Sequence, residues 1–367
     1  MPTLEWIGKS KVINHHQDVP FRVLERKYSF DENGQHEADN GSENMIIRGD
    51  NLEALKALLP RYEGRVKCIY IDPPYNTGNE GWVYNDNVND PKIKKWLGEV
   101  VGKEGEDLTR HDKWLCMMYP RLKLLQKLLH PTDGSIFISI DENEIQNLKL
   151  ICNEIFGSNH HVATIAWQKR YSRENRGAIG DAHEYILVYA SDVETFKVIR
   201  HKVEFDENSA KVYKNPNNDP KGRWRAVPMT AQGYRPNQMY PITTPSGKVC
   251  YPPQGRCWST VESEYKKLLE AGRIYFGKNG DSQPSTIRYL SEVEGMIPWT
   301  WWPHEEVGHT DEAKKEIITI LGNADSFDTP KPTRLIKRIL QIATNPDDII
   351  LDSFAGSGTT AHAVLNM

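Results

Sequence analysis

Two short stretches of the sequence combine residue types that could hold a reacting group. Asp72-Pro73-Pro74-Tyr75 directly follows an apolar run at 66–71, which predicts a buried strand. The two prolines fix the backbone and lack N–H groups, so carbonyl oxygens and the Asp72 carboxylate remain as hydrogen-bond acceptors. Tyr75 adds a flat aromatic face. Such a corner suits a planar group that carries an amine. The plainer alternative is a turn that merely ends a strand.

The second stretch is the turn Phe354-Ala355-Gly356-Ser357-Gly358, which follows a predicted strand and opens a predicted helix. Glycines let the backbone approach a ligand closely, and the N-terminus of a helix favours an anion or a carboxylate. The turn lacks the third glycine and the lysine of a P-loop, which argues against a nucleoside triphosphate. Taken alone, such a turn is also common as a purely structural connection between a strand and a helix.

Hydrophobic periodicity predicts an α/β sheet around these two stretches. Strands that alternate with helices are typical of that fold class. Strands are predicted at 44–50, 66–71, 135–140, 162–167, 184–189 and 348–351, and helices at 52–59, 114–129, 142–156, 331–342 and 360–365. Pro60 should end the first helix, and 76–112, rich in Gly, Asn and Asp, should be a long mobile loop at the mouth of a site.

Composition excludes several classes of protein. With 38% hydrophobic and 26% charged residues, the 367-residue chain is not of the intrinsically disordered type. No apolar run reaches the roughly 18 residues of a membrane span, and the N-terminus lacks a secretion signal, so a soluble cytosolic protein without membrane contact is expected. Five cysteines without a C-x-x-C pair favour reduced, structural thiols, and no metal site is expected.

The net charge of −4 hides an uneven distribution along the chain. Residues 211–290 contain 13 Lys or Arg against 5 Asp or Glu. They lie within 191–327, a stretch of short segments broken by prolines and glycines and rich in aromatic residues, which predicts a separate, irregular β-rich insertion. A basic insertion is typical of a nucleic-acid-binding module, whereas a basic surface without function is the alternative.

Taken together, the two stretches resemble a known enzyme family. Tyr70-Ile71-Asp72-Pro73-Pro74-Tyr75-Asn76-Thr77-Gly78 and Leu351-Asp352-Ser353-Phe354-Ala355-Gly356-Ser357-Gly358 are similar to the catalytic and cofactor motifs of amino-methylating DNA methyltransferases that use S-adenosylmethionine. The catalytic motif comes first, which is the permuted order of the β class. Further matches at 111–129, 133–141, 183–190 and 331–340 are most similar to the adenine methyltransferase subunits of type III restriction-modification systems.

The resemblance implies a Rossmann-like sheet with ligands at the carboxyl ends of its strands and an inserted target-recognition domain. Its implied parts are an N-terminal extension (1–43), a catalytic core (44–190), the target-recognition domain (191–327) and a cofactor-binding part (328–367). The resemblance assigns DNA binding to six basic residues: Lys169, Arg170, Arg173, Arg176, Arg223 and Arg225. A homodimer and a restriction subunit are implied by analogy alone.

The resemblance also assigns roles within the site. Asp72, Pro73, Pro74 and Tyr75 would hold a base flipped out of double-stranded DNA. Asp50 would reach the adenine of the cofactor, and the other implied cofactor contacts are Lys331, Pro332, Thr333, Asp352, Phe354, Gly356 and Gly358.

The implied reaction transfers a methyl group from S-adenosylmethionine to adenine N6. Because an amine inside a duplex cannot reach the methyl donor, the base must be flipped out. Hydrogen bonds to Asp72 and to the Pro73 carbonyl would then favour the nitrogen as it gains positive charge. No covalent intermediate is needed, so the cysteines, Cys68 among them, should be structural. A Ser-Pro-Pro-Tyr form usually accompanies cytosine N4 chemistry, so Asp72 favours adenine and cytosine remains the alternative.

The C-terminus departs from the family pattern. In the family, the helix after Gly358 is followed by a strand whose acid binds the cofactor ribose, and this sequence ends at Met367 before such a strand. In the usual order that strand lies between 348–351 and 45–50, so we expect the sequence to be a fragment. A DNA-recognition module that is inactive in this form therefore remains an alternative, as does an RNA or protein amide methyltransferase.

Overall fold

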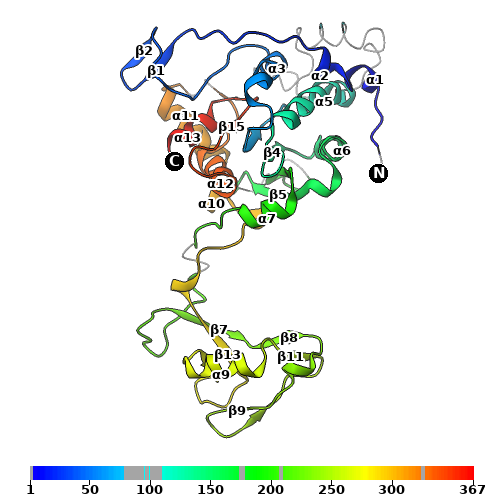
Figure 1. The fold of residues 1–367 in the computed structure, drawn as a ribbon. Helices are drawn as coiled ribbons and strands as arrows, with labels where there is room; N and C mark the ends of the chain where they lie inside the picture. Colours follow the sequence, from blue (N-terminus) through cyan, green and yellow to red (C-terminus); the bar gives the residue numbers. More distant parts are fainter. Residues whose placement is uncertain are drawn as a thin grey trace. The chain divides into compact units, whose positions relative to one another are not determined.

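The computed structural model describes residues 3–77, 95, 99, 110–172, 178–205, 210–323 and 327–367 (Figure 1). They form two compact units, Met1–His201 with Pro298–Met367 and Lys202–Ile297. Most of the loop predicted at 76–112, together with Arg173 and Arg176, lies outside the described residues. No helix in the described part of the chain is long and apolar enough to cross a membrane.

A six-stranded mixed sheet forms the centre of the first unit. In spatial order its strands are β14 (Trp301–Trp302), β5 (His161–Gln168), β6 (His183–Ala190), β4 (Ser135–Ile140), β3 (Cys68–Ile71) and β15 (Ile350–Leu351). β15, β3 and β4 run parallel, and so do β14 and β5, whereas β6 is antiparallel to both of its neighbours. The carboxyl ends of five strands and the amino end of β6 therefore share one edge of the sheet.

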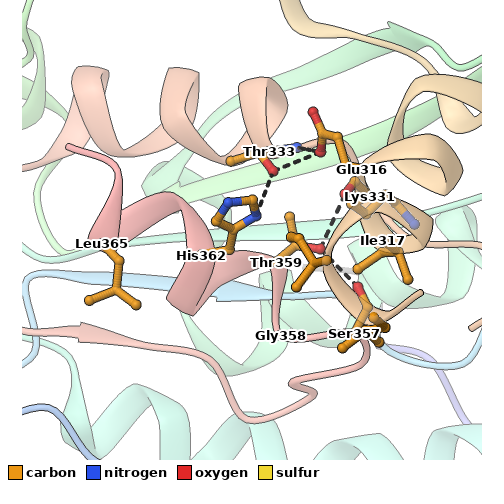
Figure 2. Close-up of a pocket in the computed structure, with 11 residues that line it drawn as sticks. Glu316, Ile317, Lys331, Thr333, Ser357, Gly358, Thr359, His362 and Leu365 are labelled. Carbon is orange, nitrogen blue, oxygen red and sulfur yellow. Dashed lines mark hydrogen bonds between the residues drawn. The ribbon is translucent and has the colours of Figure 1, made fainter. Parts of the chain in front are cut away.

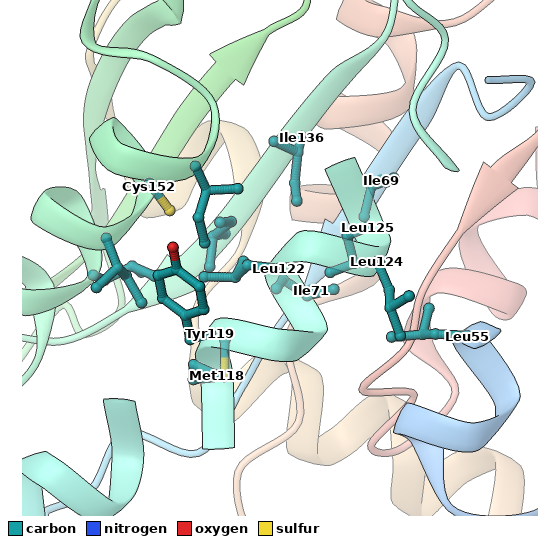
Figure 3. Close-up of a cluster of buried hydrophobic side chains, with 14 of the residues drawn as sticks. Leu55, Ile69, Ile71, Met118, Tyr119, Leu122, Leu124, Leu125, Ile136 and Cys152 are labelled. Atoms are coloured by element: carbon teal, nitrogen blue, oxygen red, sulfur yellow. The ribbon is translucent and has the colours of Figure 1, made fainter. Parts of the chain in front are cut away.

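Helices α3 (Asn51–Tyr62), α5 (Arg110–Leu128) and α6 (Ile145–Ile155) pack on one face of this sheet. Leu122 and Leu125 on α5 meet Ile69, Ile71 and Ile136 of the strands in one buried cluster (Figure 3). All residues of β3 and β4 are buried, as expected for strands covered on both faces. The predicted α/β architecture is confirmed.

The remaining elements of the first unit surround this core. The N-terminal part supplies α1 (Lys9–Val12), α2 (His15–Asp18) and the hairpin β1 (Ser29–Asp31) and β2 (Gly34–His36). A 3-10 turn, η2 (Ser158–His160), precedes β5, and α7 (Val193–Ile199) follows β6. The C-terminal part adds α10 (His304–Val307), α11 (Thr310–Leu321), α12 (Thr333–Ala343) and α13 (Thr359–Leu365). α12 contacts α10 and α13 and buries its apolar face.

The second unit consists of short strands and few helical segments. β12 (Ile274–Tyr275), β13 (Ser285–Tyr289) and β7 (Trp224–Pro228) form one antiparallel sheet. Two further strand pairs are β8 (Thr230–Gln232) with β11 (Arg256–Trp258) and β9 (Ile242–Thr243) with β10 (Val249–Cys250). The helical segments are η3 (Pro236–Gln238), α9 (Glu262–Glu270) and η4 (Leu290–Glu292). Met229, Tyr240, Trp258 and Phe276 belong to a core of its own.

This unit is shorter than the insertion that the sequence predicts at 191–327. Residues 191–201 and 298–327 belong to the first unit, because α7 packs against β6 and β14 joins the central sheet beside β5. A two-residue strand carries too little periodic signal to be recognised from sequence. The compact unit contains 14 Lys or Arg against 10 Asp or Glu, so its positive excess is smaller than that of 211–290 alone.

The strand predicted at 44–50 is wrong. The segment has no regular secondary structure and pairs with no described strand, and Ile46 is 94% exposed. An apolar run becomes a strand only where a neighbour supplies hydrogen-bond partners. The strand expected between 348–351 and this segment is not among the described strands, and β15 is the edge of the sheet. The first helix also continues past Pro60 to Tyr62, since a missing hydrogen bond near a helix end is tolerated. The other predicted strands and helices are present, with ends shifted by a few residues.

The core and the exposed segment should respond differently to truncation. Leu122→Ala removes a fully buried side chain between α5 and the sheet, and should lower the free energy of unfolding by about 2–5 kcal/mol. Ile46→Ala should change it by less than about 0.5 kcal/mol, because Ile46 is exposed. Urea denaturation followed by circular dichroism measures both. A large destabilisation by Ile46→Ala would show that this segment is packed against a partner.

Candidate functional site

Polar side chains gather at the edge of the central sheet where the strands end. Asp72 follows β3, Asp141 follows β4, Asp352 follows β15 and Lys169 follows β5, while Glu184 lies at the start of antiparallel β6. Parallel strands end at a common edge, which is where ligands bind in open α/β sheets. Groups far apart in the sequence are thereby brought into one region.

The Asp72 corner is held from two sides. The indole Nε1 of Trp114 on α5 donates to the Pro74 carbonyl at 2.6 Å. The Tyr75 hydroxyl lies 2.8 Å from Asp72 Oδ1 and 3.1 Å from Glu184 Oε2. No described residue donates to the Pro73 carbonyl, and the Asp72 side chain is 25% exposed. The corner therefore presents rigid acceptors to a ligand.

A buried ammonium group lies against this corner. Lys331 Nζ is 2.9 and 2.8 Å from the two carboxylate oxygens of Asp72 and 3.6 Å from Glu184 Oε2. Burial by itself would lower the pKa of Lys331, but Asp72 and Glu184 outweigh it and raise that pKa. Lys331 is therefore charged, and its ammonium also lies 4.9 Å from the ring centre of Tyr75.

Lys169 belongs to the same network. Its ammonium lies 2.9 Å from Asp181 Oδ2 and 3.3 Å from Glu184 Oε1, and its side chain is largely buried. The sequence predicts that Lys169 contacts a DNA phosphate. In the structure, its ammonium instead pairs with Asp181 and Glu184. Arg170, the next residue, is exposed. The sequence analysis does not select Glu184. The one local feature that marks it is that it is a single acid at the start of an otherwise apolar strand.

Asp352 organises the glycine turn after β15. Its Oδ1 accepts from the Phe354 amide at 2.9 Å and its Oδ2 from the Thr360 hydroxyl at 2.6 Å. Burial raises the pKa of Asp352 to about 6. Gly356 and Gly358 have φ angles of 54° and 78°, a region that favours glycine. Both ends of the turn are thus fixed by one carboxylate.

Asp72 and the glycine turn line one pocket, whereas Pro73, Pro74 and Tyr75 are not among its lining residues. Its walls include Asp72, Lys331, Asp352, Phe354 and Gly356, all of which the sequence analysis selects. Tyr70, Phe327, Ala355, Ser357, Thr359 and Thr360 complete the lining. The structure thus brings acids, an ammonium group, aromatic rings and hydroxyls together around one small cavity.

A second pocket adjoins the first and shares Lys331, Ser357 and Thr359 with it. Figure 2 shows that its lining comes from α11, from the start of α12 and from α13. There Thr333 donates to Glu316 at 2.7 Å, and the Thr359 hydroxyl donates to the Lys331 carbonyl at 3.2 Å. These bonds tie the residues around Lys331 to the turn.

The other predicted cofactor residues lie outside the first pocket. Asp50 caps α3, where its Oδ1 accepts from the Leu52 and Glu53 amides at 3.0 and 3.1 Å. Thr333 and Gly358 line the second pocket, and buried Pro332 precedes α12. Of the predicted DNA contacts, exposed Arg223 precedes β7 and half-buried Arg225 is part of it, both in the second unit.

All five cysteines are free and buried, in agreement with the structural role that the sequence predicts. Burial raises the pKa of Cys68 to about 12, so its thiol is protonated and a poor nucleophile.

The raised pKa of Asp352 predicts a pH-dependent contribution to stability. Because its folded-state pKa of about 6 exceeds the ordinary 3.8, the folded protein binds this proton more tightly than the unfolded chain. The contribution of this tighter proton binding to the free energy of unfolding is complete at low pH. It is lost as the pH rises from about 4 to about 6. Asp352→Asn should therefore gain stability relative to the unaltered protein over that range, as measured by urea midpoints. A pH-independent difference would contradict the shifted titration.

Comparison with known proteins covers most of the chain. Residues 66–367 match the DNA methylase family. The type III restriction-modification enzyme StyLTI Mod subunit of Salmonella typhimurium is 40% identical over 344 residues, which cover 89% of this chain and 50% of that protein. The type III restriction-modification enzyme EcoPI Mod subunit of Escherichia phage P1 is 34% identical over 407 residues, which cover 99% of this chain and 60% of that protein.

A third relative is the type II methyltransferase M.KpnI of Klebsiella pneumoniae, 31% identical over 352 residues, which cover 89% of this chain and 78% of that protein. The chain spans 50% and 60% of the length of the two Mod subunits. The resemblance found in the motifs is confirmed: the chain belongs to the DNA methylase family.

Proposed function

We propose that the protein transfers a methyl group from S-adenosylmethionine to N6 of adenine in double-stranded DNA. The observation that carries the proposal is the shared pocket of Asp72, Lys331 and Gly356. Part of its lining is the Asp72 carboxylate, an acceptor for an amine, and another part is a glycine turn beside aromatic rings. This arrangement can place a nucleobase amine opposite a methyl donor.

The chemistry of the pocket walls fits S-adenosylmethionine. Phe327 and Phe354 offer apolar faces, and Ser357 and Thr359 offer hydroxyls. A Cβ at Gly356 would lie 3.3 Å from the Phe327 ring, so glycine keeps this wall clear. When bound, the cofactor supplies a methyl group that its sulfonium already activates.

The Asp72 corner would orient and polarise the target amine. The Asp72 carboxylate and the Pro73 carbonyl are acceptors on a backbone that Trp114 holds through Pro74. Acceptors on a fixed backbone stabilise the positive charge that develops on the attacking nitrogen. Tyr75 would stack on the flipped base. Besides this charge stabilisation, positioning of the base and the methyl donor accounts for much of the rate enhancement.

The second unit offers a site for the DNA backbone. Arg225 on β7 lies directly opposite Arg288 on β13. Like charges in this position destabilise a strand pair, which favours binding of an external anion. Neither arginine has an ion pair within the described part of the chain. The Arg225 guanidinium lies 5.2 Å from the Tyr213 ring centre, and its Nε is buried without a hydrogen-bond partner. Phosphate oxygens are suitable acceptors for both arginines.

We place this activity in a cytoplasmic restriction-modification system, because two relatives are named as Mod subunits of type III enzymes. A restriction subunit and a second copy of the chain are the protein partners that this proposal includes. Cytosine N4 is the alternative target of the same pocket, and identification of the methylated nucleoside distinguishes the two bases.

Asp72→Ala should reduce methyl transfer by about 10²-fold or more, because the amine loses its carboxylate acceptor. Cofactor binding should persist. Transfer of labelled methyl groups to DNA and calorimetric titration with S-adenosylmethionine measure the two properties, with Glu32→Ala, an exposed acid in the turn between β1 and β2, as the control. Full activity of Asp72→Ala would remove Asp72 from the mechanism. Absence of any methylated nucleoside with the unaltered protein would overturn the proposed function.

Arg225→Ala and Arg288→Ala should each weaken binding to duplex DNA and reduce its salt dependence, with the slope falling by about one for each phosphate that is no longer bound. Fluorescence anisotropy over a range of salt concentrations measures the slope. Lys266→Ala is a matched control in the same unit, because the Lys266 ammonium is paired with Glu262 at 2.8 Å. Unchanged slopes would exclude the two arginines from the DNA interface.

A further inference from the structure

Two carboxylates compete for one buried ammonium at the sheet edge. Lys331 makes two short contacts with Asp72, at 2.9 and 2.8 Å, and lies 3.6 Å from Glu184. Of the three side chains, Lys331 is 9%, Glu184 12% and Asp72 25% exposed. A buried ammonium is stable only beside an anion, so Lys331 can leave one carboxylate only for the other.

The Tyr75 hydroxyl is divided between the same two acids. It lies within hydrogen-bond distance of both Asp72 Oδ1 and Glu184 Oε2, but a hydroxyl has one proton to donate. Burial raises the pKa of Tyr75 well above its ordinary value, so that proton stays on the hydroxyl. Both donors around Asp72 thus have Glu184 as an alternative acceptor.

The arrangement seen here does not suit catalysis by Asp72. Its carboxylate stabilises a positive amine through its negative charge, and two hydrogen bonds from Lys331 compensate that charge. A target amine must also compete with Lys331 for the same carboxylate oxygens. Lys331 must therefore move toward another anion before Asp72 can act at full strength.

We propose that Glu184 is a positioning residue that accepts Lys331 from Asp72 when the target amine binds. Lys169, held at 2.9 Å by Asp181, lies 3.3 Å from Glu184 Oε1 and leaves Oε2 facing Lys331 and Tyr75. A shift of the ammonium toward Glu184 leaves Asp72 uncompensated at the moment the amine arrives. This inference rests on the proposed methyltransferase function and extends it to a residue outside both motifs.

A double-mutant cycle tests the proposal. Glu184→Gln removes the alternative anion, so Lys331 stays on Asp72 and the single-turnover rate at saturating cofactor should fall about ten- to a hundredfold. Lys331→Met in the Glu184→Gln background frees Asp72 and should raise the rate again by about threefold or more, as expected for coupled residues. If Glu184 merely supported the fold, the double variant would be no faster than Glu184→Gln, and the proposal would be overturned.

Further variants keep the test decisive. Glu184→Asp retains the charge and should be faster than Glu184→Gln, and equal rates would contradict the proposal even if the double variant folds poorly. Lys331→Met alone leaves Asp72 without a neighbouring ammonium beside Glu184, which Lys169 still contacts, and should move the acidic limb of the pH–rate profile to higher pH. An unmoved limb would also count against the proposal. Glu154→Gln, which alters an ion pair with Lys9 in another part of the unit, is the matched control.

The cycle separates the two levels of inference. Methylation by the unaltered protein with a slower double variant would overturn only the role of Glu184. Failure of the unaltered protein to methylate any DNA would instead overturn the proposed function.

Discussion

The placement of one ammonium between two carboxylates is the interaction on which the site depends. Asp72 and Glu184 come from neighbouring parts of one sheet edge and would repel each other without a cation between them. Lys331 supplies that cation from the segment before α12, 259 residues from Asp72 in the sequence. Because a buried charge is expensive to leave unpaired, these contacts bind β3, β6 and the start of α12 to one another.

The rest of the first unit holds the strand ends, and so the two carboxylates and the ammonium, in fixed positions. β3 and β4 are completely buried, and α5 packs on them through a dense cluster of leucines and isoleucines, so the ends of the strands have little freedom. From the same helix, Trp114 donates to the Pro74 carbonyl and fixes the corner that follows β3. In the same pocket, Asp352 fixes the glycine turn through an amide and a hydroxyl. Rigid acceptors and a rigid turn are what a reaction governed by positioning requires.

The pocket and the opposed pair of arginines lie in different units of the chain. The first unit carries the pocket, whereas the second has its own small core and an opposed pair of arginines without carboxylate partners in the described residues. The second unit is joined to the first through both of its ends, so its sequence can vary without disturbing the central sheet. Under the proposed function, the first unit would carry the chemistry and the second would contact the DNA.

The sequence by itself determined the two motifs, the alternation of strands and helices, the structural role of the cysteines and a separate β-rich insertion. These features depend on local properties: the restricted backbone of proline, the freedom of glycine, and apolar periodicities of 2 and 3.6 residues. Such patterns lie within short windows, and the motifs additionally matched a family.

Only the tertiary structure decided which charged side chains meet. Lys331 bonds to Asp72, Lys169 is used within the protein, and Glu184 joins them because the antiparallel direction of β6 brings its first residues to the edge where the parallel strands end. The segment at 44–50 has a strand-like sequence but lacks a described partner, and two-residue β14 is a strand because β5 lies beside it. Strand pairing and ion pairing are long-range interactions, so no local window of the sequence contains them.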